Sequence, residues 1–456
     1  MKNLYSVILA AGNGTRMKSC LPKVLHKVCG KELISYVFDC FKTIRPLKTF
    51  VVIGNGSEQV KQFLKQCKNT ETVLQSERLG SAHALMQAKN KMKNLKGNVV
   101  VMCGDTPLVK EDTIKKLISY HIKNKNNATI LSGYVQNPFG YGRIVRDNSG
   151  KVSCIVEEKS ATEKEKQIKE INSGIYCFDL QTLWKALAKV KPNNSKKEYY
   201  LTDVISILNN EGFKTDAIAV CKEQEILGVN DRVQLAYAGK ILKERILNNF
   251  MINGVTIEDP SSTYISADVN IEQDTVIMPN TFIEGKTKIG KNCIIGPDTT
   301  ITDSQIKNNV SIKYSYIDNA QIEDDVKIGP FSHIRPGSLL KQKVKVGNFS
   351  EVKKSVVDEG SKVNHLSYIG DASVGKNVNI GAGTITCNYD GVSKYKTVLG
   401  DNVFVGSNTN LVAPVNIGKN VLIAAGSTVT ENVVEDKLVI ARSRQIIKER
   451  KNKKRG

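Results

Sequence analysis

The amino-acid sequence lacks the features that mark several common classes of protein. Only one of its 456 residues is Trp and only 6% are aromatic, although 40% are hydrophobic, so Val and Ile must fill most of any core. No apolar run approaches the roughly 18–20 residues that cross a membrane. The ten Cys contain no C-x-x-C pair, which argues against a zinc ribbon or a disulfide framework and indicates a reducing compartment. We therefore expect a cytoplasmic protein that does not enter a membrane.

Negative charge is also scarce, because 45 acidic residues stand against 66 basic ones and leave a formal net charge of +21. Such an excess suits acidic ligands such as nucleotides and sugar phosphates, although a Lys-rich composition accounts for most of it. The basic run at residues 448–455 has no interleaved aromatic residues, and the chain has no recognisable nucleic-acid module. This run is therefore predicted to be a solvated tail, and no nucleic-acid partner is expected.

The first half of the chain alternates strand-like and helix-like patterns. The run at residues 6–10 is too short for the apolar part of a signal peptide and leads directly into a glycine-rich basic loop, so we interpret it as a buried first strand. Further short apolar runs lie at 50–53, 99–103 and 129–134, and helical patterns lie at 33–42, 58–66, 81–92 and 112–124. This alternation predicts a Rossmann-like α/β domain with a largely parallel sheet covered by helices.

A six-residue repeat of aliphatic residues runs through the second half. A period of six fits neither a helix nor a single amphipathic strand, but it fits a β-solenoid in which each hexapeptide forms one short strand and one turn. A β-sandwich with coincidental spacing is the alternative, and six consecutive repeats at constant intervals disfavour it. A Gly often follows the aliphatic residue and is predicted to occupy a tight corner. The aliphatic series are Ile289, Ile295 and Ile301; Ile322, Ile328 and Ile334; and Leu399, Val405, Leu411, Ile417, Ile423 and Val429.

These patterns divide the chain into three parts. Apolar residues at helical spacing from about Arg232 to Phe250, after a plausible N-cap at Asp231, predict a connecting helix. We therefore expect a first domain at 1–230, a linker helix at 231–252 and a solenoid domain with its basic tail at 253–456. The repeat is interrupted between Ile385 and Leu399, and such insertions are usually loops on one face, often the binding face.

Two motifs in the first half carry candidate chemistry. The loop at residues 9–17 follows a strand but is neither a Rossmann fingerprint, because Met17 occupies the third glycine position, nor a Walker A motif. Its bare backbone N–H groups could face phosphates, with Arg16 and Lys23 adding positive charge, although an ordinary tight turn is the alternative. The second motif is the Asp105 carboxylate, which ends a buried strand and could hold a Mg²⁺ bridging phosphates, or could belong to an ordinary Gly-Asp turn.

Taken together, these motifs resemble the sugar nucleotidyltransferases, and most closely the family of bacterial bifunctional N-acetylglucosamine-1-phosphate uridyltransferases and glucosamine-1-phosphate acetyltransferases. The strings that carry the resemblance in the first half are Leu9–Met17, Leu21–Leu25, Leu79–Ala84, Gly140–Ile144, Ile155–Glu157, Glu170–Gly174 and Gly228–Asn230. The resemblance implies an α/β nucleotidyltransferase domain followed by a left-handed parallel β-helix of hexapeptide repeats. It also implies transfer of UMP from UTP to N-acetylglucosamine 1-phosphate, with release of pyrophosphate.

The resemblance also assigns residues in the first half. It implies that the uridine nucleotide is held by Leu9, Ala10, Ala11, Gly12, Lys23, Gln75, Gly80 and Ser81. The implied sugar ligands are Gly142, Glu157, Asn172 and Asn230, and Asp105 with Asn230 is implied to bind Mg²⁺. Two positions depart from the family pattern, since Ser81 replaces a Thr but keeps a hydroxyl, and Cys103 replaces a Tyr. The reaction is expected to be an in-line displacement without a protein nucleophile, in which Arg16 and Lys23 stabilise developing phosphate charge.

In the second half, His365 is one of only five His in the chain and lies on a repeat turn. A His there could take a proton from an amine near neutral pH, although a lone His is more often structural. Arg335 and Lys353 could jointly hold a sugar phosphate, or each could be a solvated surface charge.

The strings around the interrupting loop and the last coils also resemble the acetyltransferase half of the same family. By that resemblance His365 is the general base, Arg335, Lys353, Tyr368 and Asn379 bind glucosamine 1-phosphate, and Asn388 with Tyr389 lines the acceptor site. Ala382, Ser407, Ala425 and Arg442 are implied to contact acetyl-CoA. A homotrimer with sites between neighbouring β-helices is likewise implied. Two alternatives remain open at this point: a single nucleotidyltransferase with a regulatory β-helix, and a scaffold without catalysis.

Overall fold

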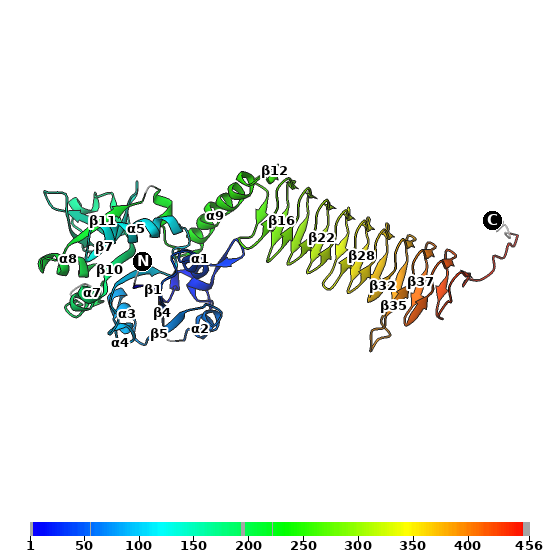
Figure 1. The fold of residues 1–456 in the computed structure, drawn as a ribbon, viewed down its shortest axis with the longest axis horizontal. Helices are drawn as coiled ribbons and strands as arrows, with labels where there is room; N and C mark the ends of the chain where they lie inside the picture. Colours follow the sequence, from blue (N-terminus) through cyan, green and yellow to red (C-terminus); the bar gives the residue numbers. More distant parts are fainter. Residues whose placement is uncertain (1–2, 55, 193–196, 221, 450–456) are drawn as a thin grey trace, which may run out of the picture. The chain divides into compact units, whose positions relative to one another are not determined.

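The computed structural model describes residues 3–449 except 55, 193–196 and 221, so residues 450–455 of the basic tail lie outside the described residues. The chain divides into two compact units, residues 1–242 and 243–456. Figure 1 shows an α/β arrangement in the first and a stack of short strands in the second.

The first unit is built on a mostly parallel sheet in the order β11-β7-β10-β6-β1-β4-β5. β10 is antiparallel to both of its neighbours, and β8 and β9 form an antiparallel hairpin attached to it. The strands are β1 (Leu4–Ala10), β4 (Thr49–Gly54), β5 (Thr70–Gln75), β6 (Asn98–Cys103), β7 (Ala128–Tyr134), β8 (Arg143–Arg146), β9 (Val152–Val156), β10 (Glu170–Asp179) and β11 (Thr215–Ala219), with a separate hairpin of β2 (Lys27–Val28) and β3 (Lys31–Glu32). The predicted α/β class is confirmed, and the predicted first strand is β1.

Helices cover both faces of this sheet because successive strand residues point to opposite sides. On β1, for example, Val7 packs in a core with α3, α7 and α8, whereas Ile8 packs in a core with α1, α2 and α5. The helices are α1 (Leu33–Asp39), α2 (Glu58–Leu64), α3 (Ser81–Gln87), α4 (Lys89–Met92), α5 (Glu111–Lys123), α6 (Glu163–Lys166), α7 (Leu180–Leu187) and α8 (Asp203–Asn210). The sheet therefore provides a rigid platform whose strand ends can carry a site.

The predicted connecting helix is α9, which spans Arg232–Ile252. Ala238 and Leu242 pack with Val28 and Leu33 in a small core of the first unit, whereas Leu247 belongs to the core of the second. The boundary between the two units falls after residue 242, within this helix. The division at 230 and 252 that the sequence suggested stays a prediction.

The second unit is the predicted left-handed parallel β-helix of hexapeptide repeats, whose strands form three parallel sheets in the described part of the chain. The first sheet runs from β12 (Thr256–Ile257) to β41 (Leu438–Val439), the second from β13 (Tyr264–Ile265) to β40 (Thr428–Val429), and the third from β14 (Asn270–Ile271) to β38 (Val415–Ile417). Each sheet takes every third strand, so three hexapeptides complete one coil. Ile277, Ile295, Ile312, Ile328 and Val346 are paired in succession and buried, which is the expected inward stack.

One detail of the β-helix differs from the expectation. At the interruption the inward residue is Thr386, which is buried, whereas Ile385 is 43% exposed, so the aliphatic pattern was out of phase by one residue there.

The glycines that follow inward aliphatic residues lie, as expected, where a Cβ would be costly. The cause at many of them is close approach between coils, and a Cβ on Gly400, for example, would lie 2.8 Å from the Lys419 nitrogen. Among residues other than glycine, most left-handed corners are occupied by Asn or Asp, such as Asn402.

Candidate active sites

A cavity of about 410 Å³ opens at the carboxyl end of β1 in the first unit. This is the place where parallel α/β sheets bind ligands, because loops diverge there and leave backbone N–H groups unpaired. Nine residues predicted from the sequence line it: Leu9, Ala10, Ala11, Gly12, Lys23, Gln75, Gly80, Ser81 and Asp105. The structure thus brings the predicted nucleotide ligands and the predicted metal carboxylate to one cavity.

The glycine-rich loop is shaped so that its backbone faces this cavity. At Gly12, no heavy atom of the described residues outside its immediate neighbours lies within 4 Å of the position that a Cβ would take, so the peptide is open to a ligand. Gly14 has a φ of 58°, and a Cβ there would lie 2.8 Å from the Lys23 Cβ. Both conditions favour glycine, and they let Lys23 approach the loop closely. Met17, which breaks the Rossmann pattern, is buried and anchors the following 3₁₀ turn, Thr15–Met17.

Four polar side chains meet beside this loop. The Lys23 ammonium forms an ion pair with Asp105 and donates to the Asn230 Oδ1 at 3.3 Å, and Arg16 donates to the same oxygen at 3.1 Å. Asn230 reaches this point because the Val229 N–H donates to the Asp105 carbonyl oxygen at 2.9 Å. A carboxylate oxygen and an amide oxygen at one point are ligands that suit Mg²⁺, which usually completes its shell with water and substrate phosphates. The donor set therefore fits the expected metal.

The predicted sugar ligands Gly142, Glu157 and Asn172 form a second group. A Cβ on Gly142 would lie 3.7 Å from the Glu157 Oε1 and from the Asn172 Cβ, and the Asn172 N–H donates to the Gly142 carbonyl oxygen at 2.8 Å. The Glu157 carboxylate accepts a hydrogen bond from the Thr202 hydroxyl at 3.1 Å. These three residues do not line the 410 Å³ cavity, so the predicted nucleotide and sugar subsites are separate groups.

Cys103 lines the cavity beside Asp105. Burial, and then the nearby Asp105 carboxylate, raises the pKa of the Cys103 thiol to about 12, so the thiol is protonated at neutral pH. Its Sγ lies 3.6 Å from the Cβ position of Gly174, which follows Asn172 on β10. Cys103 therefore contributes a small neutral group to the 410 Å³ cavity, on the side of β10.

Sequence reasoning missed Arg78, which also lines the cavity. Its Nε donates to the Ala11 carbonyl oxygen at 2.9 Å and so holds the glycine-rich loop. Its position in the sequence could have indicated this role, because Arg78 lies two residues before Gly80, which was already predicted to bind the nucleotide.

In the β-helix, His365 lies on the corner between β30 (Lys362–Val363) and β31 (Tyr368–Gly370) and is exposed. Its Nδ1 lies 2.8 Å from the Oδ1 of Asn348, which occupies the same corner one coil earlier. Because an amide oxygen only accepts, this contact selects the tautomer with hydrogen on Nδ1 and leaves a lone pair on Nε2. The arrangement suits a general base, and Asn348 was not found from the sequence because its partner is 17 residues away.

The predicted ligands of the sugar phosphate fall on two different sheets. Lys353 ends β28 (Glu351–Lys353) and Tyr368 begins β31 in the second sheet, and Arg335 follows β25 (His333–Ile334) of the same sheet. Arg335 is held by an ion pair of 2.6 Å with Glu351. Asn379, in contrast, begins β33 (Asn379–Ile380) of the first sheet. One chain therefore groups three of these four residues on one sheet.

The four residues predicted to contact acetyl-CoA follow strands of the first sheet at one corner of successive coils. Main-chain hydrogen bonds join these coils, from the Asn408 N–H to the Ala382 oxygen at 2.7 Å and from the Gly426 N–H to the Ser407 oxygen at 2.8 Å. Arg442 donates from a guanidinium nitrogen to the Ala425 oxygen at 2.6 Å. The result is a continuous edge that passes from the corner of His365 toward the last coils.

The interrupting loop begins at Asn388, which is buried and donates to the Asp371 carboxylate at 2.5 Å. The next residue, Tyr389, is 57% exposed, and its hydroxyl donates to the Gly391 oxygen at 2.5 Å. The loop is thus anchored at its base and presents an aromatic ring to solvent.

Comparisons with known proteins agree with both units. Residues 5–222 match the nucleotidyl transferase family, residues 268–303 match the bacterial transferase hexapeptide family, and residues 316–414 match the GMPPB C-terminal domain. Proteins described as bifunctional protein GlmU are similar over nearly the whole chain. Those of Caldanaerobacter subterraneus and Thermoanaerobacter pseudethanolicus are 53% and 54% identical, and that of Clostridioides difficile is 49% identical; each alignment covers 98% of this chain and 97% of the relative.

In the described part of the chain, no helix combines the length and the apolar character that spanning a membrane requires.

Proposed function

Because the chain belongs to the family of bifunctional GlmU proteins, we propose that it performs two transfers in sequence. It acetylates glucosamine 1-phosphate with acetyl-CoA, and it then transfers UMP from UTP to the resulting N-acetylglucosamine 1-phosphate. The products are UDP-N-acetylglucosamine and pyrophosphate. The observation that carries this proposal is that each of the two units carries its own cluster of candidate catalytic and binding side chains, which the single-activity and scaffold alternatives do not require.

In uridylyl transfer, the phosphate oxygen of the sugar attacks the α-phosphorus of UTP and pyrophosphate leaves. The loop Leu9–Gly12 and the Gly80–Ser81 turn hold the nucleotide, and Gly142, Glu157 and Asn172 hold the sugar. Lys23 and Arg16 stabilise the charge that grows on the transferring phosphoryl group, since positioning and charge neutralisation carry such reactions. In the resting cluster Lys23 pairs with Asp105, so its ammonium is already held at the reacting end of the cavity.

Asp105 and Asn230 would hold Mg²⁺, which when bound neutralises phosphate charge and orients the leaving group. Lys23 contacts both of these residues, so its ammonium lies beside the position that the metal would take.

In acetyl transfer, the amine of glucosamine 1-phosphate attacks the thioester of acetyl-CoA. The amine must be neutral, so His365 accepts its proton at Nε2, while Asn348 keeps the ring in the required tautomer. Arg335, Lys353 and Tyr368 bind the sugar phosphate, and Asn388 with Tyr389 closes the acceptor side. Ala382, Ser407, Ala425 and Arg442 contact acetyl-CoA along the corner edge.

We further propose a homotrimer that works in the cytoplasm. The placement of Asn379 on a different sheet from Arg335, Lys353 and Tyr368 supports a site shared between neighbouring copies. In such an assembly one copy supplies Asn379 to a sugar phosphate held by the second sheet of its neighbour.

The test uses one incubation of the full chain with glucosamine 1-phosphate, acetyl-CoA, UTP and Mg²⁺, read by mass spectrometry. Asp105→Ala should stop uridylyl transfer and accumulate N-acetylglucosamine 1-phosphate, because the metal carboxylate is lost. His365→Ala should stop acetylation but still convert added N-acetylglucosamine 1-phosphate. Asp112→Ala, on the exposed surface of α5, is the matched control and should change neither. A wild-type protein that forms neither product would refute the proposal.

A further inference from the structure

A buried arginine lies next to the proposed sugar site. Arg143 begins β8 and is only 1% exposed. Its guanidinium donates to the Glu158 carboxylate at 2.7 Å, to the Lys166 carbonyl oxygen at 3.5 Å, and to the Tyr141 carbonyl oxygen. A cation is costly to bury unless it is paired and hydrogen-bonded, so these contacts hold the guanidinium in one place.

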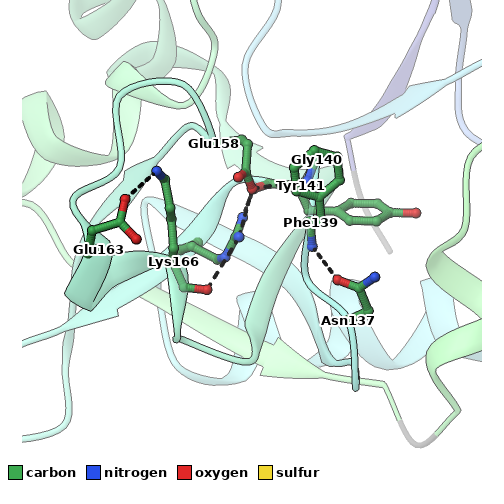
Figure 2. A network of polar contacts seen from close by, with 8 residues as sticks. Asn137, Phe139, Gly140, Tyr141, Glu158, Glu163 and Lys166 are labelled. Atoms are coloured by element: carbon green, nitrogen blue, oxygen red, sulfur yellow. Dashed lines mark hydrogen bonds and ion pairs between the residues drawn. The ribbon is translucent and has the colours of Figure 1, made fainter.

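The Glu158 carboxylate also forms a hydrogen bond with this turn. Its carboxylate accepts the Gly140 N–H at 3.0 Å, and Figure 2 shows Glu158 facing the turn that carries Phe139, Gly140 and Tyr141. The hydrogen bond from Arg143, followed by that from Gly140, holds the pKa of Glu158 below its usual value. Asn137 begins the turn and accepts the Phe139 N–H at 3.1 Å. The ionised pair therefore holds the turn at Gly140 and Tyr141, next to Phe139, which is 76% exposed and adds little packing of its own.

The position of this pair relates it to the sugar. Arg143 directly follows Gly142, and Glu158 directly follows Glu157, so each partner is the chain neighbour of a proposed sugar ligand. The pairing of β8 with β9 places Arg143 opposite Val156. The ion pair therefore sets how far the Gly142 peptide lies from the Glu157 carboxylate.

We propose that Arg143 and Glu158 are positioning residues for the sugar phosphate: their ion pair fixes the turn 137–142 against Glu157 and so sets the affinity for the sugar but not for the nucleotide. This inference rests on the proposed function of the first unit. Neither side chain lines the nucleotide cavity, which is why the two affinities separate.

The test is steady-state uridylyl transfer by the full chain carrying Glu158→Gln. Glutamine keeps the size and the hydrogen-bond acceptor of glutamate, so the turn can still form, but the charge that fixes the guanidinium is lost. We expect KM for N-acetylglucosamine 1-phosphate to rise about tenfold, consistent with loss of one charge-assisted hydrogen bond. KM for UTP and the rate of acetyl transfer should stay within twofold. Arg143→Lys keeps the positive charge but loses the planar guanidinium with its several N–H donors, and it should raise the same KM by a smaller factor.

Glu163→Gln is the matched control. Glu163 belongs to the neighbouring pair with Lys166 in Figure 2, but it is exposed and contacts no residue of the turn 137–142 in the described structure. This variant should behave as wild type.

Equal rises in the two KM values, or a loss of acetyl transfer with a lowered melting temperature, would show a merely structural pair and overturn the inference. An unchanged sugar KM in Glu158→Gln would do the same while leaving the proposed function intact. A wild-type protein that does not use the sugar phosphate would overturn both.

Discussion

Replacing Asn348 by Ala tests how the β-helix prepares the proposed general base, His365. The Asn348 amide oxygen lies 2.8 Å from the His365 Nδ1 and is the group that selects the ring tautomer. A neutral hydrogen bond contributes about 0.5–1.5 kcal/mol, which corresponds to a factor of roughly 2 to 12 in rate. We therefore expect kcat for acetyl transfer to fall by about that factor. His365→Ala removes the base itself and should cost about 10²–10⁴.

The assay follows acetylation of glucosamine 1-phosphate chromatographically, with uridylyl transfer measured on the same preparation as an internal control for folding. If Asn348 acts only through His365, the double variant should be no slower than His365→Ala alone, because contacting residues are not additive. An Asn348→Ala enzyme with unchanged kcat would refute the orienting role. A double variant slowed by the product of the two factors would show that Asn348 acts independently of His365.

Two further predictions concern stability. Gly400→Ala should destabilise the β-helix by about 1–3 kcal/mol through overpacking, because the new Cβ would lie 2.8–3.1 Å from main-chain atoms of Gly418 and Lys419 that cannot move aside. Calorimetry should show this loss as a lower melting temperature, and an unchanged transition would contradict the close-approach argument. Glu170→Ala should destabilise the first unit, because Arg146 and Ser132 lose their hydrogen-bond acceptor. We expect a loss of roughly 3 kcal/mol, the lower end of the range for a broken buried ion pair, because Arg146 is partly exposed. Burial would raise the pKa of Glu170, but the hydrogen bonds from Arg146 and Ser132 outweigh it and hold the pKa below 4.5. Its stabilising effect is therefore present above pH 4.5 and is lost as the pH falls through the folded-state pKa. Urea unfolding from pH 7 to pH 3 should show a smaller loss in Glu170→Ala than in wild type, and parallel losses would exclude this pair as the cause.

At the interrupted coil, the preference for an aliphatic residue and the pairing between coils favour different inward residues. The six-residue period located the β-helix because the inward position recurs locally, and steps of six from Val374 and Ile380 lead to the buried Thr386. The choice of the aliphatic neighbour Ile385 over Thr386 was the error, because a Thr is not expected at an inward position. The register is decided by pairing with Leu411 of the next coil, which is opposite Thr386.

Glycine shows what the tertiary structure adds. The sequence pattern predicted corners where a Cβ would be costly, and at Gly400 that cost comes from the nearness of the next coil. Close approach between segments 18 residues apart has no signature in either segment alone. Among the β-helix residues other than glycine, left-handed backbone belongs mostly to Asn and Asp, whose short polar side chains tolerate that conformation.

By itself, the sequence determined the two architectures and the chemical character of both sites, because hydrophobic period and short motifs act within a few residues of one another. The tertiary structure alone decided which side chains cooperate. It paired Lys23 with Asp105 and with Asn230, His365 with Asn348, and Arg143 with Glu158. These partners lie 15 or more residues apart along the chain, so their contacts depend on the sheet and the coils that carry them rather than on local preference.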